Sequence, residues 1–182
     1  MIRIIDFFLA LVGLLVSSPI LLLIFILGYV DTRSPIFLQT RMGKNKKAFT
    51  LIKFRTMSLE TESVASHLAS KTNITRFGAF LRKTKLDEIP QLINVIKGEM
   101  SLVGPRPNLL NQDELIKERD LLEVYSVLPG ITGLSQITNI DMSTPQLLAK
   151  TDNRMIQSLT IKGYFSYLIK TILGQGSGDA VK

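Results

Sequence analysis

The chain has 182 residues, of which 46% are hydrophobic and 20% charged, and its formal net charge at pH 7 is +7. With no cysteine and a single histidine, His67, the sequence excludes disulfides, a thiolate nucleophile and a histidine-rich metal site. Chemistry therefore has to rest on carboxylates, lysine, arginine, hydroxyl groups or a bound cation. The basic charge fits three kinds of partner, namely nucleic acid, anionic lipid and phosphorylated small molecules.

The apolar residues concentrate near the N-terminus, where residues 7–30 include no charged side chain. About twenty apolar residues are enough to cross a bilayer. Ser17-Ser18-Pro19 interrupts this run, however, and proline bends a helix because it removes one backbone donor and clashes with the preceding turn. Serine hydroxyl groups can bond to the backbone groups that such a bend frees.

Basic residues flank the apolar segment on both sides, with Arg3 before it and Arg33, Arg41, Lys44, Lys46 and Lys47 after it. Because positive residues prefer the cytoplasmic side, this pattern favours a re-entrant helix that enters one leaflet, turns at Ser18-Pro19 and returns. A proline-kinked spanning helix is the alternative. A cleaved signal peptide is disfavoured, since the apolar core is too long for one.

We divide the chain into a membrane helix over residues 1–33, a catalytic domain over 34–173 and a flexible, glycine-rich tail over 174–182. The domain is predicted to be small and mainly helical, so that the fold class is α+β. Residues 36–40 and 49–54 are rich in β-branched and aromatic side chains. With a polar stretch between them, they predict a β-hairpin.

Apolar residues at helical spacing predict helices over 74–81, 86–96, 114–127, 146–156 and 164–173. Residues 58–72 are polar and helix-like. The 164–173 segment is apolar and aromatic between Lys162 and Lys170. It is either a core helix or an amphipathic helix that lies on the membrane surface.

The sharpest candidate for chemistry is Asp87-Glu88, near the start of the predicted 86–96 helix, with Pro90 close behind. Adjacent residues on a helix do not face each other, so these carboxylates do not bracket a glycosidic bond as those of a glycosidase do. They can instead divide labour, one as a nucleophile and the other as a metal ligand. The alternative for a bare acid pair is a helix cap or a solvated surface.

Basic residues surround the acid pair, and the candidates for phosphate binding are Lys53, Arg55, Arg76, Arg82 and Arg106. The last of these stands between two prolines, and its few conformations suit capture of a phosphate. The equally weighted alternative is that this segment is a structural turn whose arginine pairs with an acid on the surface. Nearby cations favour the ionised carboxylate, which is the form that attacks phosphorus. A diphosphate donor would also need a hard divalent cation, with Mg²⁺ the default.

Four runs of residues resemble the bacterial monotopic phosphoglycosyl transferases, also called the bacterial sugar transferase family. They are KFRTM at 53–57, TRFGAFLRK at 75–83, LDEIPQLINV at 86–95 and KGEMSLVGPRP at 97–107. The resemblance extends to Arg3, Asp6, Ser18-Pro19 and PGITG at 129–133, so it covers nearly the whole chain. In length the chain is similar to the minimal members, which have a catalytic domain and one membrane helix.

The resemblance implies a re-entrant helix broken at Ser18-Pro19 and a covalent nucleophile at Asp87, which displaces UMP from a UDP-sugar. Polyprenyl phosphate then takes the phosphosugar in a ping-pong scheme with Mg²⁺. Glu88 is implied as a Mg²⁺ ligand beside Asp87, and Arg82 and Arg106 match positions suited to phosphate. The product would be a polyprenyl-diphosphate sugar that starts a surface glycan, for example a lipopolysaccharide O-antigen.

Two positions depart from the pattern of many members. Leu128 stands where an arginine or lysine usually precedes the PGITG motif. Residues 136–141 contain no arginine, although many members read Gln-Val-Asn-Gly-Arg there. We expect this loop to contact the donor sugar or nucleotide, so the departure leaves the sugar unidentified and the core chemistry unchanged.

The predicted partners are a UDP-sugar, polyprenyl phosphate and the lipid of one leaflet, with a homodimer left open. The predicted location is the cytoplasmic face of the bacterial inner membrane. Nucleic acid is not among the partners, because the chain has no tryptophan, few tyrosines and a membrane segment. The rival function is a non-catalytic membrane protein that binds phospholipid or phosphosugar. The acid pair argues against it, since bare carboxylates repel phosphates.

Overall fold

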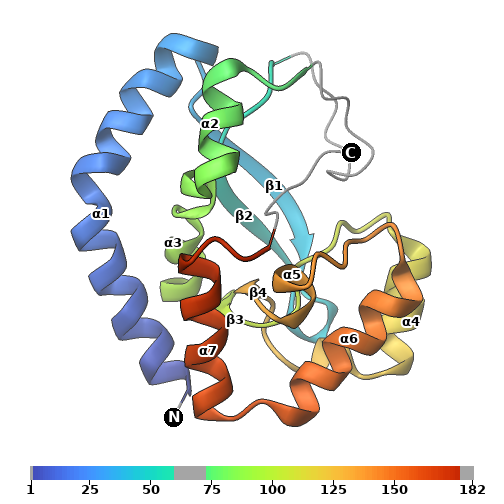
Figure 1. The fold of residues 1–182 in the computed structure, drawn as a ribbon. Helices are drawn as coiled ribbons and strands as arrows, with labels where there is room; N and C mark the ends of the chain where they lie inside the picture. The colour runs from blue at the N-terminus through green and yellow to red at the C-terminus, as the bar shows by residue number, and fades with distance from the viewer. Residues whose placement is uncertain (1, 60–72, 177–182) are drawn as a thin grey trace.

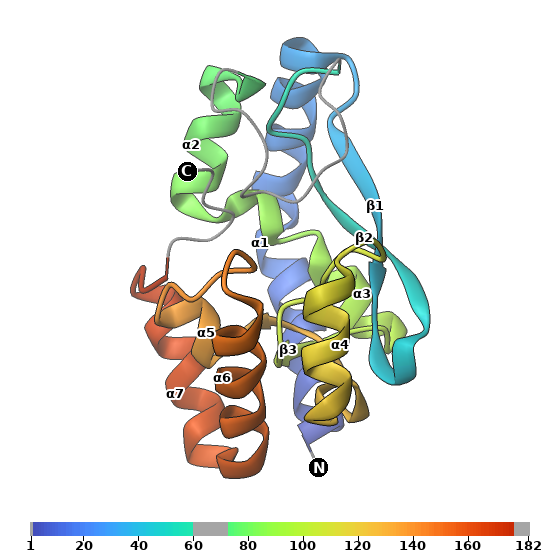
Figure 2. The same cartoon turned by 90° about the vertical axis from the view of Figure 1, so that its right-hand side faces the viewer.

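The computed structural model describes residues 2–59 and 73–176, which form a mixed helix-and-sheet fold as expected (Figure 1). In chain order the elements are α1 (Ile2–Thr32), β1 (Ile36–Met42), the 3₁₀ turn η1 (Lys44–Lys46), β2 (Ala48–Phe54), α2 (Arg76–Thr84), the 3₁₀ turn η4 (Leu86–Glu88), α3 (Gln91–Lys97), β3 (Ser101–Val103), α4 (Asp113–Leu121), the 3₁₀ turn η5 (Val124–Ser126), β4 (Gly130–Thr132), α5 (Leu134–Ile137), α6 (Pro145–Ser158) and α7 (Ile161–Ile172). In the turned view α5, α6 and α7 gather on one side, the β1–β2 hairpin lies on the other and α1 runs behind both (Figure 2). Most of the helix-like segment 58–72 lies outside the described residues.

The N-terminal apolar segment forms one helix of 31 residues, α1, which continues through Pro19 and bends near its middle (Figure 1). Proline offers no N–H to the carbonyl four residues earlier, which here belongs to Leu15. The Ser18 hydroxyl donates to that carbonyl at 2.8 Å, and the Ser17 hydroxyl donates to the Gly13 carbonyl at 2.6 Å. The expected bend and its serine partners are present, within a continuous helix rather than at a break.

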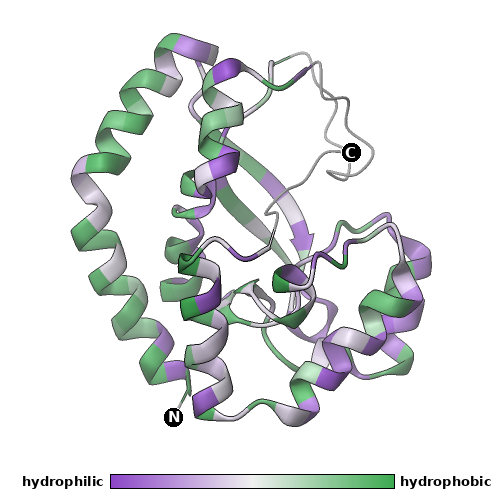
Figure 3. Ribbon diagram, viewed as in Figure 1, coloured by the Kyte–Doolittle hydropathy of each residue, from purple (hydrophilic) through white to green (hydrophobic). Residues whose placement is uncertain are grey.

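Both ends of α1 are fastened to the same globular body. Near the N-terminus the buried Asp6 carboxylate accepts hydrogen bonds from the Leu102 N–H at 2.9 Å and the Tyr164 hydroxyl at 2.6 Å. Near the C-terminus the buried Ile24 packs with Phe54 of β2. The other faces of α1 are apolar and exposed (Figure 3), and α1 is the one helix among the described residues that is long and apolar enough to cross a membrane.

The predicted hairpin is confirmed, with β1 and β2 antiparallel over the register that runs from Ile36 opposite Phe54 to Met42 opposite Ala48. Helix α3 is tied to this hairpin through the fully buried Asn94. The Asn94 amide donates to the Thr50 carbonyl at 2.7 Å, and its oxygen accepts from the Ile52 N–H at 3.1 Å. A buried amide satisfied on both sides fixes the position of α3.

Two strands of three residues each, β3 and β4, pair in parallel, and the sequence patterns did not predict them. Segments this short show no readable alternation. The first residue of β4 approaches the start of the GPRP loop (residues 104–107), which follows β3. A Cβ added to Gly130 would lie 2.0 Å from the Gly104 nitrogen. Glycine is therefore required at position 130.

Two predicted helices are corrected. The 86–96 segment is not one helix, because η4 precedes α3 and Pro90 lies at the boundary. The 114–127 segment is helical in α4 only to Leu121, and Glu123 then adopts the left-handed conformation with φ 53°. The helices expected over 74–81, 146–156 and 164–173 are confirmed as α2, α6 and α7.

The α7 helix combines the two predicted alternatives. Tyr164 is buried at 1% exposure, whereas Ile172 is 83% exposed. One face of α7 therefore belongs to the core, and apolar side chains on another face remain uncovered.

The predicted flexible tail begins with three described residues that make contacts. The Lys85 ammonium donates to the Gln175 carbonyl at 2.6 Å, and the backbone of Gly176 lies against that of Gln136. Residues 177–182 lie outside the described residues.

We expect Gly130→Ala to destabilise the protein by about 1–3 kcal/mol, because the new methyl group forces the Gly104 backbone aside. Gly163→Ala is the matched control, since the new Cβ would lie no nearer than 3.3 Å from its closest neighbour, the hydroxyl oxygen of the helix cap Thr160, and the position is helical. It should leave stability unchanged or raise it by up to about 1 kcal/mol. Urea unfolding in detergent micelles measures both, and equal midpoints for Gly130→Ala and wild type would contradict the close approach.

Candidate active site

Asp87 and Glu88 lie in η4, the short turn between α2 and α3. Lys85 ends α2 in the left-handed conformation with φ 58°, which redirects the chain so that the acid pair follows at once. Both acids are buried, with Asp87 at 2% and Glu88 at 7% exposure. The pair is therefore neither a helix cap of α3 nor part of a solvated surface.

Arg106 forms an ion pair with Glu88, with 2.7 Å between the Arg106 Nη2 and Glu88 Oε1 atoms. Lys85 lies within electrostatic reach of both groups. Burial lowers the pKa of Lys85, the Glu88 carboxylate opposes this shift, and the Arg106 guanidinium adds to it. Two segments that are separate in sequence, the turn at residues 85–88 and the loop that carries Arg106, thus place two cations and one carboxylate together, an arrangement suited to binding phosphate.

The GPRP loop that carries Arg106 is held by consecutive backbone oxygens. The carbonyls of residues 104–108 accept hydrogen bonds, in order, from Gln136 at 3.2 Å, Gly130 at 2.8 Å, Arg119 at 2.8 Å, Arg41 at 3.3 Å and Met42 at 2.9 Å. The donors come from β1, α4, β4 and α5. Because each peptide of the loop is fixed from outside, Arg106 is presented by a preorganised backbone.

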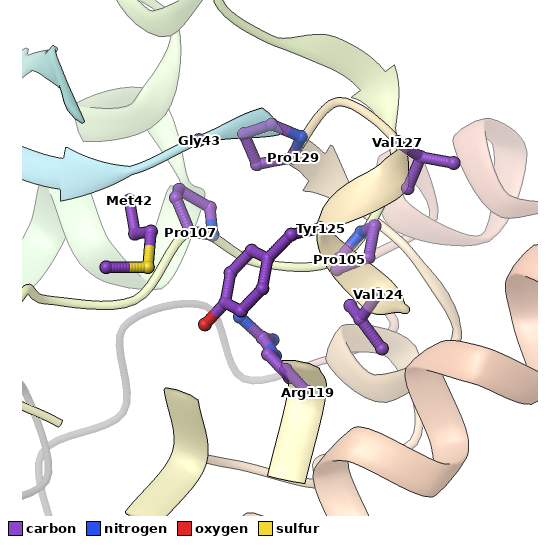
Figure 4. A pocket seen from close by; sticks show the side chains of 9 residues that line it. All are labelled: Met42, Gly43, Pro105, Pro107, Arg119, Val124, Tyr125, Val127 and Pro129. Carbon is purple, nitrogen blue, oxygen red and sulfur yellow. The ribbon is translucent and has the colours of Figure 1, made fainter. Parts of the chain in front are cut away.

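Beneath this loop lies a buried polar network around Arg119 and Asp152. Their side chains are 2.6 Å apart and almost fully inaccessible. Arg119 also donates to Asn108 Oδ1 at 3.0 Å, which accepts from the Tyr125 hydroxyl at 3.0 Å. Figure 4 shows Tyr125 and Arg119 beside Pro105 and Pro107, with which they line a small pocket. Arg119 is thus a positioning residue for the loop.

Arg82 is placed by the end of β2. Its Nε atom donates to the Thr56 hydroxyl at 2.8 Å, and Thr56 is buried at 3% exposure. Helix α2 can approach this segment because Gly78 lies against the Thr56 backbone, where a Cβ would come within 2.1 Å of the carbonyl oxygen. The KFRTM and TRFGAFLRK runs therefore form one unit that positions Arg82.

The remaining cations predicted to bind phosphate differ in their surroundings. Lys53 is buried on β2, a strand that packs against η4, and its ammonium lies 5.5 Å from the centre of the Phe37 ring. Arg55 donates to the Ser34 carbonyl at 2.9 Å, which directs it to the base of the hairpin. Arg76 is exposed at the first position of α2. Lys53 and Arg55 thus lie over the same Phe37 ring, whereas Arg76 is on the surface of α2.

A Mg²⁺ ion fits this site only if water and substrate phosphates supply most of its ligands. Among the described residues no group of three or more acids or histidines is placed to hold a metal. Magnesium commonly takes one or two protein carboxylates and completes its shell with water and substrate phosphates. Asp87 and Glu88 supply two such carboxylates, and Glu88 Oε1 is also bonded to Arg106.

Sequence reasoning missed the residues that support the site. Arg119 and Asp152 occur in polar helical stretches, where charged residues usually face solvent. Asn108 and Tyr125 belong to no motif that the sequence analysis identified. The contact of Gln136 with the Gly104 carbonyl places the divergent 136–141 segment beside the GPRP loop.

We expect Arg119→Met to cost about 3–5 kcal/mol of stability, because it leaves the Asp152 charge buried and unpaired. The double variant Arg119→Met/Asp152→Leu should recover most of this loss. Lys46→Ala, which removes an exposed ion pair with Asp120, should cost less than about 1 kcal/mol. Denaturant unfolding in micelles measures all three, and a double variant no more stable than the single would contradict the buried-charge explanation.

Comparison with known proteins matches residues 1–175 to the family model described as bacterial sugar transferase. The exopolysaccharide production protein PSS of Rhizobium leguminosarum bv. phaseoli is 38% identical over an alignment of 178 positions, which covers 92% of this chain and 88% of that protein. The UDP-glucose:undecaprenyl-phosphate glucose-1-phosphate transferase of Escherichia coli (strain K12) is 42% identical over 72% of this chain, which spans 30% of that protein. A putative undecaprenyl-phosphate N-acetylgalactosaminyl 1-phosphate transferase of Bacillus subtilis (strain 168) is 44% identical over 58% of this chain, which spans 60% of that protein.

The acid pair, the GPRP loop and the apolar helix thus occur in a chain that belongs to the bacterial sugar transferase family.

Proposed function

We propose that this protein transfers a sugar phosphate from a UDP-sugar to polyprenyl phosphate, with Asp87 as a covalent nucleophile. The observation that carries the proposal is the buried acid pair, of which Glu88 is ion-paired with Arg106 on a preorganised loop, beside Lys85. The names of the Escherichia coli and Bacillus subtilis relatives support this reaction class. Those two names specify different sugars, so the sugar transferred here is not assigned.

In the first step an Asp87 oxygen forms a bond to the phosphorus that bears the sugar. The bond from that phosphorus to the bridging oxygen of the diphosphate breaks, and UMP leaves with the electron pair. In the second step an oxygen of polyprenyl phosphate attacks the same phosphorus. The Asp87–phosphorus bond breaks, which regenerates the carboxylate and yields polyprenyl-diphosphate sugar.

Arg106 and Lys85 are placed to bind the phosphate oxygens, and Arg82 is fixed nearby through Thr56. Glu88 orients Arg106 through the 2.7 Å ion pair. Bound Mg²⁺, held by the acid pair and the donor diphosphate, would neutralise charge on the leaving group. Because Asp87 is almost fully buried, the donor can reach it only when the surrounding residues move apart.

We propose further that α1 is re-entrant and that the protein lies on the cytoplasmic face of the bacterial inner membrane. The support is that Asp6 near one end and Ile24 near the other are both buried against one globular body. In a spanning arrangement that body, with its charged and polar groups, would have to lie in hydrocarbon. A bend at Pro19 allows both ends of α1 to return to the same surface.

We expect Asp87→Asn to abolish UMP release and to gain no phosphosugar mass when it is incubated with donor alone. The amide lacks the negative charge needed to attack phosphorus. Asp113→Asn is the control, since Asp113 is an exposed residue at the start of α4 and should keep wild-type turnover. Intact mass spectrometry and UMP release measure the outcome, and full activity in Asp87→Asn would exclude the nucleophile assignment.

We expect one cysteine added before Met1 and another introduced by Asp31→Cys to be labelled from the same side of the membrane. The natural chain has no cysteine, so each single-cysteine variant gives an unambiguous signal. Membrane-impermeant maleimide, applied to right-side-out and to inverted vesicles, makes the measurement. Labelling of the two positions from opposite sides would establish a spanning helix.

A further inference from the structure

A large open cavity of about 580 Å³ lies among α1, α3 and α7. Its apolar lining includes Gly13 of α1, Leu92 of α3 and the α7 side chains Phe165, Ile169 and Ile172. We refer to this cavity as the α1–α7 groove. Its volume lies in the range of ligand-binding pockets, and its lining is mainly apolar.

Two charged residues, Lys85 and Glu88, line the α1–α7 groove together with Thr84, Thr132 and Thr171. Because Glu88 is also the partner of Arg106 at 2.7 Å, the groove reaches the proposed active site. The Lys85 ammonium donates to the Gln175 carbonyl at 2.6 Å, so its Nζ atom lies at the edge of this site. The groove therefore offers an ammonium group next to the ion pair, and most of its remaining lining is hydrocarbon.

The α7 side of the groove is a partly exposed stripe of apolar side chains. Phe165, Ile169 and Ile172 follow the i, i+4, i+7 spacing of one helix face and are 40%, 56% and 83% exposed. Uncovered apolar surface of this kind marks a binding site or a membrane contact. On the opposite side stands α1, whose outer faces are apolar too.

Gly13 keeps the α1 side of the groove close to α3. A Cβ at this position would lie 3.1 Å from Leu92 Cδ1, so a larger side chain would push into the groove or against α3. The Ser17 hydroxyl bonds to the Gly13 carbonyl, within the part of α1 that leads to the bend at Pro19. The groove thus runs beside the bent part of α1 that we place in the leaflet.

We propose that the α1–α7 groove binds the isoprenoid chain of the polyprenyl phosphate acceptor, with the acceptor phosphate held at Lys85 beside Glu88. This inference rests on the proposed function. A lipid with one long apolar chain and a phosphate group matches a mainly apolar lining that also contains the charged residues Lys85 and Glu88. A second copy of this chain would leave the Lys85 end without a matching group.

The test compares two reactions of the purified protein in micelles. The first is exchange of labelled UMP into the UDP-sugar, which needs donor alone. The second is transfer to undecaprenyl phosphate or to geranyl phosphate, which have eleven and two isoprene units. We expect Ile169→Trp, which fills the groove, to raise the KM for undecaprenyl phosphate about tenfold while UMP exchange stays at the wild-type rate.

Phe165→Ala is the second variant, in case the tryptophan disturbs folding, and it should raise the same KM at least threefold. Geranyl phosphate should be affected little by either change, because its short chain fills little of the groove. Leu173→Trp is the matched control, since Leu173 is a 75% exposed residue at the end of α7 that does not line the groove. Its KM values should equal those of wild type.

Three outcomes would overturn the inference. One is normal UMP exchange with an unchanged undecaprenyl phosphate KM in both groove variants. Another is equal inhibition of transfer by phosphatidic acid and by a non-transferable undecaprenyl phosphonate, which would indicate a general lipid site. The third is a disulfide between two Ile169→Cys chains, which would place a second copy over the groove. Absence of UMP exchange in wild type would instead refute the proposed function itself.

Discussion

The ion pair between Glu88 and Arg106 joins two parts of the chain on which the rest of the site depends. Glu88 belongs to the turn between α2 and α3, whereas Arg106 follows β3, and 2.7 Å separates their charged groups. This ion pair holds its geometry only if both backbones are rigid. A buried charge that loses its partner destabilises the folded protein. The Asn94 bonds to the hairpin fix one side, and the hydrogen bonds to the carbonyls of residues 104–108 fix the other. The hydrogen bonds that stabilise the polar core are therefore also the ones that fix the geometry of the site.

The membrane helix is part of this framework rather than an appendage. Asp6 of α1 accepts hydrogen bonds from Leu102 in β3 and from Tyr164 in α7, so the helix is bonded to elements on both sides of the α1–α7 groove. In the proposed reaction a soluble donor and an acceptor that lies in lipid have to meet at the membrane surface. The bonds of α1 to β3, the strand that precedes Arg106, would then set the distance between the membrane and the residues that we propose to bind phosphate.

The site could be predicted from the sequence only in part. Asp87, Glu88, Arg82 and Arg106 stood out because charged residues clustered within recognisable motifs. Arg55 was an equally good candidate in the sequence, because residues two apart, such as Lys53 and Arg55, point to the same face of a strand. In the structure, however, the Arg55 guanidinium donates to the Ser34 carbonyl. Arg119 and Asp152 gave no local signal, because their burial results from contacts between α4 and α6.

The sequence by itself determined the elements whose causes are local: the long apolar helix, its bend at Pro19, the hairpin and most of the helices. It also determined the family, because the motifs are long and specific. Only the tertiary structure decided the β3–β4 pairing, the burial of the acid pair, the network under the GPRP loop and the α1–α7 groove. Each of these joins residues far apart in the chain, and local propensity and periodicity contain no information on such contacts.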